Sequence, residues 1–94
     1  MRIKIKFYAR FQEYFGSEII KEIDNNSSDT LKNIAKSVTE DNPEGQAFIF
    51  DDAGNFYDYV ILMKNGERIY SDNADEIFVE DGDEIRIFPP VSGG

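Results

Sequence analysis

One long helical pattern constrains the fold of this chain more than any other feature of its sequence. Four apolar residues recur at positions i, i+3, i+4 and i+7, which places them on one face of a helix: Leu31, Ile34, Ala35 and Val38. The Ser-Ser-Asp sequence at 27–29 supplies N-cap chemistry, and proline and glycine at 41–45 end the pattern. We therefore expect a main helix over 28–40, whose apolar face must be covered by a sheet.

The segments around this helix have the character of strands. Residues 2–8 alternate strictly, with Ile3, Ile5 and Phe7 facing inward. Further strands are expected at 19–23, at 57–64 (a nearly continuous apolar run expected at the centre of the sheet), at 68–70 and at 84–88. Residues 47–50 fit either an extension of the helical layer or an edge strand. One helix across a mixed four- to five-stranded sheet, an α+β fold, satisfies this order.

Charge and composition exclude several classes of function. The 94 residues include 19 acidic and 10 basic side chains, which give a net charge of −9. Such a chain repels nucleic acids and anionic membranes, so we expect neither DNA nor a membrane as a partner. With no cysteine and no histidine, the chain lacks a thiol nucleophile and the commonest general base. No apolar run reaches the length of a membrane span and no signal-peptide core is present, which predicts a cytoplasmic protein.

The last six residues differ from the rest of the chain. Two prolines restrict φ and make a stiff spacer, whereas two glycines have no side chain and can enter a narrow channel. We divide the chain into a folded domain over 1–88 and a flexible tail over 89–94, which could reach about 20 Å when extended. The terminal carboxylate of Gly94 is the one group predicted to react, and a frayed end without function is the alternative. The residues expected to thread into a partner are Pro89, Pro90, Val91, Ser92 and Gly93.

Several motifs in this order resemble the ubiquitin-like sulfur carriers of the MoaD and ThiS type. The segment 5–11, followed by Gly16, is similar to the first strand and turn of that family, and Asn65-Gly66-Glu67 is similar to its central hairpin. The ending over 81–94 is closer to MoaD than to ThiS because of its Pro-Pro step. An insertion around 46–57 resembles the small archaeal modifier proteins. The resemblance spans nearly the whole chain and implies a β-grasp fold.

The resemblance also implies a substrate and carrier protein rather than an enzyme. A ubiquitin-activating-type adenylyltransferase would use ATP to convert the Gly94 carboxylate to an acyl-adenylate, and a persulfide donor would then supply sulfur for a thiocarboxylate. The chain has no Walker loop and no GxGxxG motif, so we expect it to bind no cofactor itself. As a carrier it would be the small subunit of molybdopterin synthase, acting with a large subunit in molybdenum or tungsten cofactor biosynthesis. The alternatives are a modifier that forms isopeptide bonds with lysines of target proteins, and a sulfur donor for tRNA thiolation or thiamin synthesis.

Four side chains are candidates for the surface that binds a partner. Tyr8 and Phe88 face outward on the first and last strands, which are neighbours in a β-grasp fold, and Arg86 and Arg68 are expected beside them. Exposed aromatic and arginine side chains are favoured in interface cores, and a simple cap on the sheet is the alternative. The acidic clusters match no EF-hand loop, so we expect solvated turns and no metal site.

Overall fold

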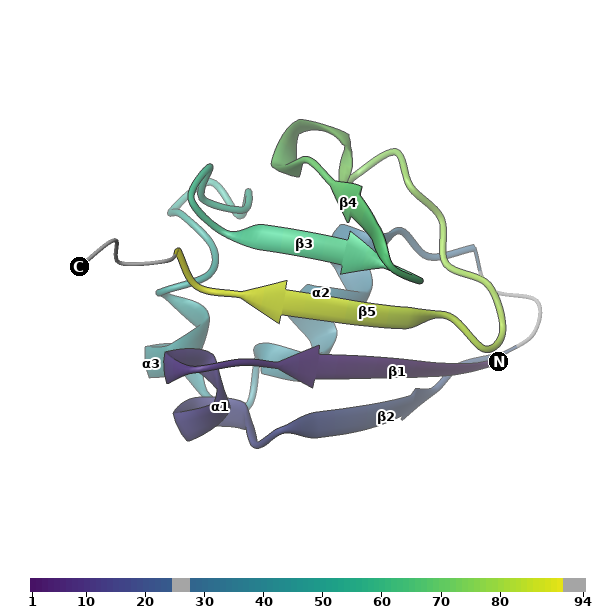
Figure 1. Ribbon diagram of the computed structural model, residues 1–94, viewed down its shortest axis with the longest axis horizontal. Coiled ribbons are helices and arrows are strands. Elements are labelled where there is room, and N and C mark those ends of the chain that lie inside the picture. Colours follow the sequence, from purple (N-terminus) through teal and green to yellow (C-terminus); the bar gives the residue numbers. More distant parts are fainter. Residues whose placement is uncertain (25–27, 91–94) are drawn as a thin grey trace.

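The computed structural model describes residues 1–24 and 28–90. In these residues five strands form one mixed sheet with the order β2-β1-β5-β3-β4 (Figure 1). Strand β1 pairs with β5 in parallel, and all other neighbouring strands pair antiparallel. The strands are β1 (Arg2–Phe7), β2 (Glu18–Glu22), β3 (Ile61–Lys64), β4 (Glu67–Ile69) and β5 (Glu84–Phe88). The helices are α1 (Arg10–Phe15), α2 (Leu31–Thr39), α3 (Pro43–Gln46) and a 3₁₀ turn, η1 (Ser71–Asn73).

Alternation of side chains along the strands builds the core. Ile3, Ile5 and Phe7 of β1 have no exposed surface, as predicted. Ile85 and Ile87 of β5 are equally buried and lie beside Ile5 and Phe7 in the parallel register. Each fully buried large apolar side chain contributes about 1.5–3 kcal/mol, so this inner face of the sheet carries much of the stability.

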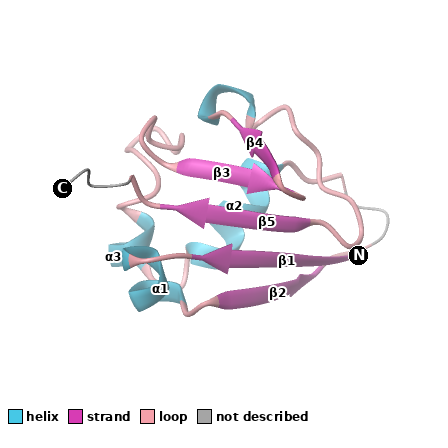
Figure 2. Cartoon of the chain, in the orientation of Figure 1, coloured by secondary structure: helices cyan, strands magenta, loops and turns pink. Residues whose placement is uncertain are grey.

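Helix α2 covers the inner face of the sheet, behind it in the view of Figure 2. Leu31, Ile34 and Ala35 are buried in the core, as their spacing predicted. The helix begins at Leu31 rather than at residue 28, because Thr30 is the N-cap and its Oγ1 accepts a hydrogen bond from a backbone N–H three residues on, at 3.1 Å. No helix within 1–24 and 28–90 is long and apolar enough to cross a membrane.

The segment between α2 and β3 consists of α3 and turns, and a strand predicted at 57–64 forms only in its second half. The sequence of residues 47–50 allowed either helix or strand. In the structure these residues follow α3 and continue it as helical turns. The predicted strand at 57–64 is wrong over its first four residues: Val60 N–H donates to Tyr57 O at 3.0 Å, which closes a turn, and β3 begins only at Ile61. Stacking of Tyr57 on Tyr59, with ring centroids 4.9 Å apart, stabilises this turn, although isolated aromatic residues favour strands. The central strand of the sheet is β5, not this segment.

The turn of the β3–β4 hairpin is hydrogen-bonded to the turn that precedes β5. Asn65 and Gly66 have φ angles of 51° and 86°, which is the left-handed pair that a type I′ hairpin requires. Asn65 Nδ2 donates to Asp83 Oδ1 at 2.8 Å, and Asn65 Oδ1 accepts from Glu84 N–H at 2.9 Å. Asp83 is only 6% exposed and also accepts from the backbone N–H of Glu80 at 2.7 Å. These bonds fix the entry of the chain into β5.

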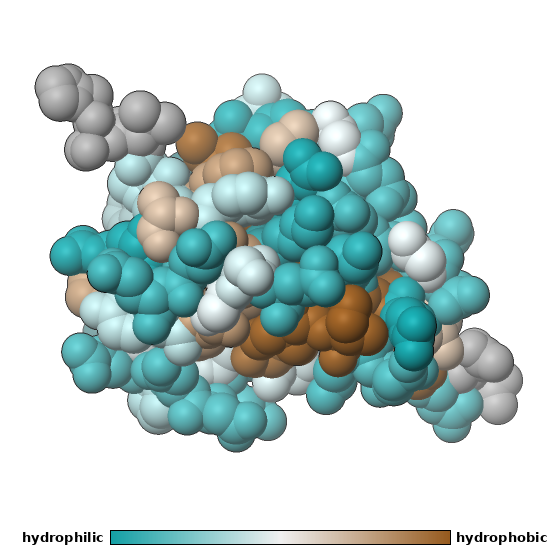
Figure 3. Space-filling model, turned by 60° about the horizontal axis from the view of Figure 1, so that its bottom comes forward, coloured by the Kyte–Doolittle hydropathy of each residue, from teal (hydrophilic) through white to brown (hydrophobic). Residues whose placement is uncertain are grey.

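Strand β2 forms one edge of the sheet and has apolar side chains on both of its faces. Ile19 packs partly against the core, whereas Ile20 is 42% exposed on the opposite face. Figure 3 brings the β2 side of the molecule forward and shows apolar surface there among hydrophilic side chains.

Candidate functional site: the sheet face at the tail root

The chain leaves the folded domain from the middle of the sheet. Strand β5 lies between β1 and β3 and ends at Phe88 (Figure 1). Pro89 and Pro90, which we call the tail root, follow it and are half-buried and exposed, respectively. The predicted contact and reacting residues Val91, Ser92, Gly93 and Gly94 lie outside the described residues. The surface from which the tail departs is therefore the part of the site that the structure defines.

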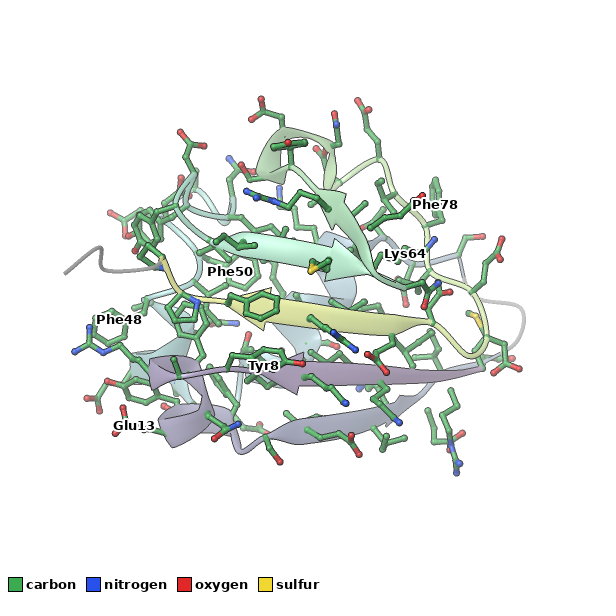
Figure 4. The ribbon with its side chains drawn as sticks, viewed as in Figure 1. Tyr8, Glu13, Phe48, Phe50, Lys64 and Phe78 are labelled. Carbon is green, nitrogen blue, oxygen red and sulfur yellow. The ribbon has the colours of Figure 1, made fainter. Side chains whose placement is uncertain are left out.

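Tyr8 and Phe88 lie side by side next to the tail root, as the sequence predicted. In the parallel register of β1 and β5, Phe7 is beside Ile87 on the inner face, so the residues that follow them point outward. The two outward rings stack with their centroids 4.2 Å apart and their planes 12° from parallel. Figure 4 shows Tyr8 in front of the sheet. The two rings form a preformed flat surface, and their role in binding stays a prediction.

A row of side chains with three cations continues this outer face. Lys6, Arg86, Met63 and Arg68 are successive neighbours across β1, β5, β3 and β4. Arg86 lies two residues before Phe88 on β5, next to the stacked rings. Arg68 lies on β4, two strands away from Arg86, and Met63 of β3 separates the two arginines. The guanidinium carbon of Arg68 lies over the ring of Tyr70, 4.9 Å from its centroid. A cationic row on a chain with a net charge of −9 favours a partner surface with acidic side chains.

A glutamate holds Arg86 in position. Arg86 Nε donates to Glu84 Oε1 at 2.7 Å. This hydrogen bond lowers the pKa of the Glu84 carboxyl, and the charges of Arg86, Lys6 and Lys4 add to the effect while burial opposes it. The same bond raises the pKa of Arg86. Lys6 and Arg68 make no ion pair with the residues of 1–24 and 28–90, so they are the cations of the row that a partner can pair.

The surface is hollowed beside the stacked rings. The sheet-face hollow has a volume of about 500 Å³, and its lining is mainly apolar: Tyr8, Ala9, Ile61, Met63, Phe88, Pro89 and Pro90. Ile61 and Met63 face outward because they are the register partners of Phe88 and Arg86. Neither was predicted as a site residue, because the apolar run at 57–64 has no visible alternation. In the structure Val60 and Leu62 are buried, so side chains alternate along this strand and Ile61 and Met63 face outward.

Asp51, an acidic residue outside this surface, forms a turn. Asp51 Oδ1 accepts from the backbone N–H groups of Ala53 and Asn55 at 2.9 and 3.0 Å, which closes a tight turn. Across residues 1–24 and 28–90, no group of three or more acidic side chains is arranged to hold a metal ion.

The strand order of the mixed sheet and the helix α2 packed across it define the fold as a ubiquitin-like β-grasp. The structure superposes on the crystal structure of small archaeal modifier protein 1 from Haloferax volcanii with a TM-score of 0.83 and 28% identity, covering all of both chains. In sequence, the chain is 30% identical to small archaeal modifier protein 1 of Haloferax volcanii over 89 residues, which are 95% of this chain and 97% of that protein. A putative molybdopterin converting factor subunit 1 from Pyrococcus furiosus shares the fold, with a TM-score of 0.69 and 21% identity, covering 97% of this chain and 99% of that one.

The model of the ThiS family matches residues 5–94. The chain therefore belongs to the ThiS family, which confirms the resemblance seen in its motifs. It is a member of a ubiquitin-like family of sulfur carriers and protein modifiers.

Proposed function

We propose that this chain is a sulfur carrier that is a substrate of other enzymes rather than a catalyst. In this proposal Gly94 ends the chain, and a ubiquitin-activating-type adenylyltransferase converts its carboxylate to an acyl-adenylate. A persulfide donor then turns the acyl-adenylate into a thiocarboxylate. The observation that carries the proposal is the family match over residues 5–94, which includes both terminal glycines.

Activation is needed because a carboxylate is a poor electrophile. A Gly94 carboxylate oxygen attacks the α-phosphorus of ATP and pyrophosphate leaves. The terminal persulfide sulfur then attacks the Gly94 carbonyl carbon and AMP leaves, and a thiol reduces the resulting acyl disulfide to the thiocarboxylate. The partner supplies the ATP site and the oxyanion stabilisation, since the chain has no phosphate-binding loop. Because the reaction needs ATP, which the cytoplasm supplies, the cytoplasm is the location that goes with this proposal.

The sulfur acceptor that we propose is a pterin precursor held by a larger subunit. The chain would then be the small subunit of molybdopterin synthase, in molybdenum or tungsten cofactor biosynthesis. The Pro89-Pro90 step before the glycines supports this acceptor over thiamin synthesis, because that step resembles molybdopterin synthase small subunits more than ThiS.

The outer sheet face is the proposed docking surface for these partners. A partner that takes up the tail must approach Pro89 and Pro90, and both residues line the sheet-face hollow with Tyr8 and Phe88. Apolar contacts in this hollow would supply affinity, while Arg86 and the more distant Arg68 would orient an acidic partner surface.

A second candidate function is that of a protein modifier. It is supported by the 30% identity to small archaeal modifier protein 1 over 95% of the chain. The first step, adenylation of Gly94, is the same in both functions. The two differ in the nucleophile, because a lysine amine of a target protein would take the acyl group and form an isopeptide bond.

Mass spectrometry tests both candidates. The intact chain, incubated with the adenylyltransferase of the same organism, ATP and a sulfur source, should gain the mass of one oxygen replaced by sulfur. A chain lacking Gly93 and Gly94 is the control and should gain nothing. If the wild-type chain accepts neither AMP nor sulfur, the carrier proposal is wrong.

The modifier function requires a different search in digested cell extract. Trypsin cuts after Arg86, the last basic residue, so the remnant on a target lysine would be the peptide Ile87–Gly94 rather than Gly-Gly. Finding this branched remnant on target lysines would support the modifier function. Its absence under several growth conditions would count against it.

A further inference from the structure

A second hollow borders the tail root on the side of α1 and α3. It has a volume of about 390 Å³. Ala9, Pro89 and Pro90 line both hollows, whereas four residues line only this one: Arg10, Phe11, Phe48 and Tyr59. Figure 4 shows Phe48 at the end of the molecule from which the chain leaves toward its C-terminus. We call this space the aromatic hollow, and it is continuous with the proposed docking surface through the three shared residues.

The walls of the aromatic hollow are held by specific contacts. The Phe48 ring stacks on Tyr14 of α1 with centroids 5.6 Å apart, and the backbone oxygen of Phe48 accepts a hydrogen bond from the Tyr59 hydroxyl at 3.1 Å. Partial burial raises the pKa of that hydroxyl, and the neighbouring Tyr57 adds to the effect, so the donor stays protonated at physiological pH. Gly45 lets α3 approach α1 directly, because a Cβ there would lie 2.6 Å from Tyr14 Cβ. The hollow is therefore preformed.

Arg10 gives the aromatic hollow its charge. Its guanidinium carbon lies 5.2 Å from the centroid of the Phe48 ring, and the side chain is exposed. Although the chain has 19 acidic residues, Arg10 makes no ion pair with any residue of 1–24 and 28–90. An arginine whose guanidinium lies over a ring keeps N–H groups available for two bonds to a carboxylate. A partner surface that complements this hollow therefore carries an acidic side chain next to an apolar one.

We propose that an extended loop of the adenylating partner docks in the aromatic hollow, with a carboxylate paired to Arg10 and a neighbouring apolar side chain between Phe48 and Tyr59. This inference rests on the proposed function, in which the partner must take up the tail as far as Gly94. Because the tail root lies between the two hollows, a partner that encloses the tail meets both of them. A partner that filled only the sheet-face hollow would leave the aromatic hollow, with its unpaired Arg10, exposed to water.

A pair of charge reversals tests the inference. Arg10→Glu reverses the charge at the aromatic hollow. Lys36→Glu is the matched control, because Lys36 Nζ also lies over a phenylalanine ring, 5.8 Å from the centroid of Phe50, and lines neither of the two hollows. The measurement is ATP–pyrophosphate exchange by the adenylyltransferase of the same organism, with each variant as the varied substrate, and thermal unfolding confirms that each variant is folded.

We expect Arg10→Glu to raise KM about tenfold or more and to leave kcat nearly unchanged, since a docking contact acts on binding. Lys36→Glu should stay within about twofold of the wild type, because the Lys36 charge lies outside the docking surface. Equal KM values for the two variants, or a loss confined to kcat, would overturn the inference while the proposed function stands. A wild-type chain that is not adenylated at all would overturn both.

Discussion

Replacement of Ala9 with glycine should stabilise the folded chain, although alanine-to-glycine changes usually destabilise. Ala9 has φ 51° and ψ −128°, and Phe11 N–H donates to Tyr8 O at 3.1 Å, so these residues form a type II′ turn whose second position normally holds glycine. Alanine in this region stores about 1–3 kcal/mol of strain, while glycine adds about 0.5–1 kcal/mol of unfolded-state entropy. The difference predicts a net stabilisation of about 1 kcal/mol, or about 4–8 °C in the unfolding midpoint of a chain of this size.

Thermal and urea unfolding, followed by far-ultraviolet circular dichroism, measure this effect. The matched control is Ala47→Gly, because Ala47 is exposed and has φ −65° and ψ −17°, a conformation that alanine adopts without strain. There the change should destabilise by up to about 1 kcal/mol. If Ala9→Gly lowered the midpoint as the control does, the strain assigned to the turn would be refuted.

Substitutions at three further positions test the packing and the electrostatics. Gly45→Ala should cost about 1–3 kcal/mol in urea unfolding, because the new Cβ would lie 2.6 Å from Tyr14 Cβ, and an unchanged midpoint would contradict the direct contact of α1 with α3. Asp83→Ala should cost about 1–3 kcal/mol, since it leaves its hydrogen-bond donors without their acceptor, whereas Asp83→Asn keeps one acceptor and should cost less. In an NMR titration Glu84 should ionise below the pH at which an ordinary glutamate does, so its contribution to stability is complete above the unfolded pKa and is lost as the pH falls through the lower folded pKa. Arg86→Met should return that pKa toward its ordinary value, and a pKa that did not move would show that the 2.7 Å hydrogen bond is not its cause.

The stacked pair at the tail root was predictable from the sequence because each step is local or follows from the fold. Alternation along residues 2–8 and 84–88 assigns Tyr8 and Phe88 to the outer face. The family resemblance implies that the first and last strands are neighbours, and their pairing in the structure, which is parallel, places the two rings together. The position of Arg86 follows from the same alternation, two residues before Phe88.

The aromatic hollow was not predictable in this way. Arg10, Phe48 and Tyr59 lie on three segments that are far apart in the sequence and have no common periodicity. Their proximity depends on α3 packing against α1 and on the turn at 57–60, where a strand was predicted instead. Aromatic and β-branched residues favour strands in isolation. Here Tyr57 stacks on Tyr59 within the turn, and the Tyr59 hydroxyl donates a hydrogen bond to the backbone oxygen of Phe48, a contact outside the turn.

The sequence by itself determined the α+β class, the main helix, the buried side chains of β1 and β5, and the motifs that relate the chain to the ThiS family. These depend on periods of 2 and 3.6 residues and on turn chemistry, which are properties of short segments. Only the tertiary structure decided that β5 is central, that Met63 separates Arg68 from Arg86, and that Ala9 and the two prolines lie between two hollows. The physical reason is that strand order, cross-strand register and the packing of α1 against α3 are set by contacts between segments distant in the chain, and no local pattern encodes those contacts.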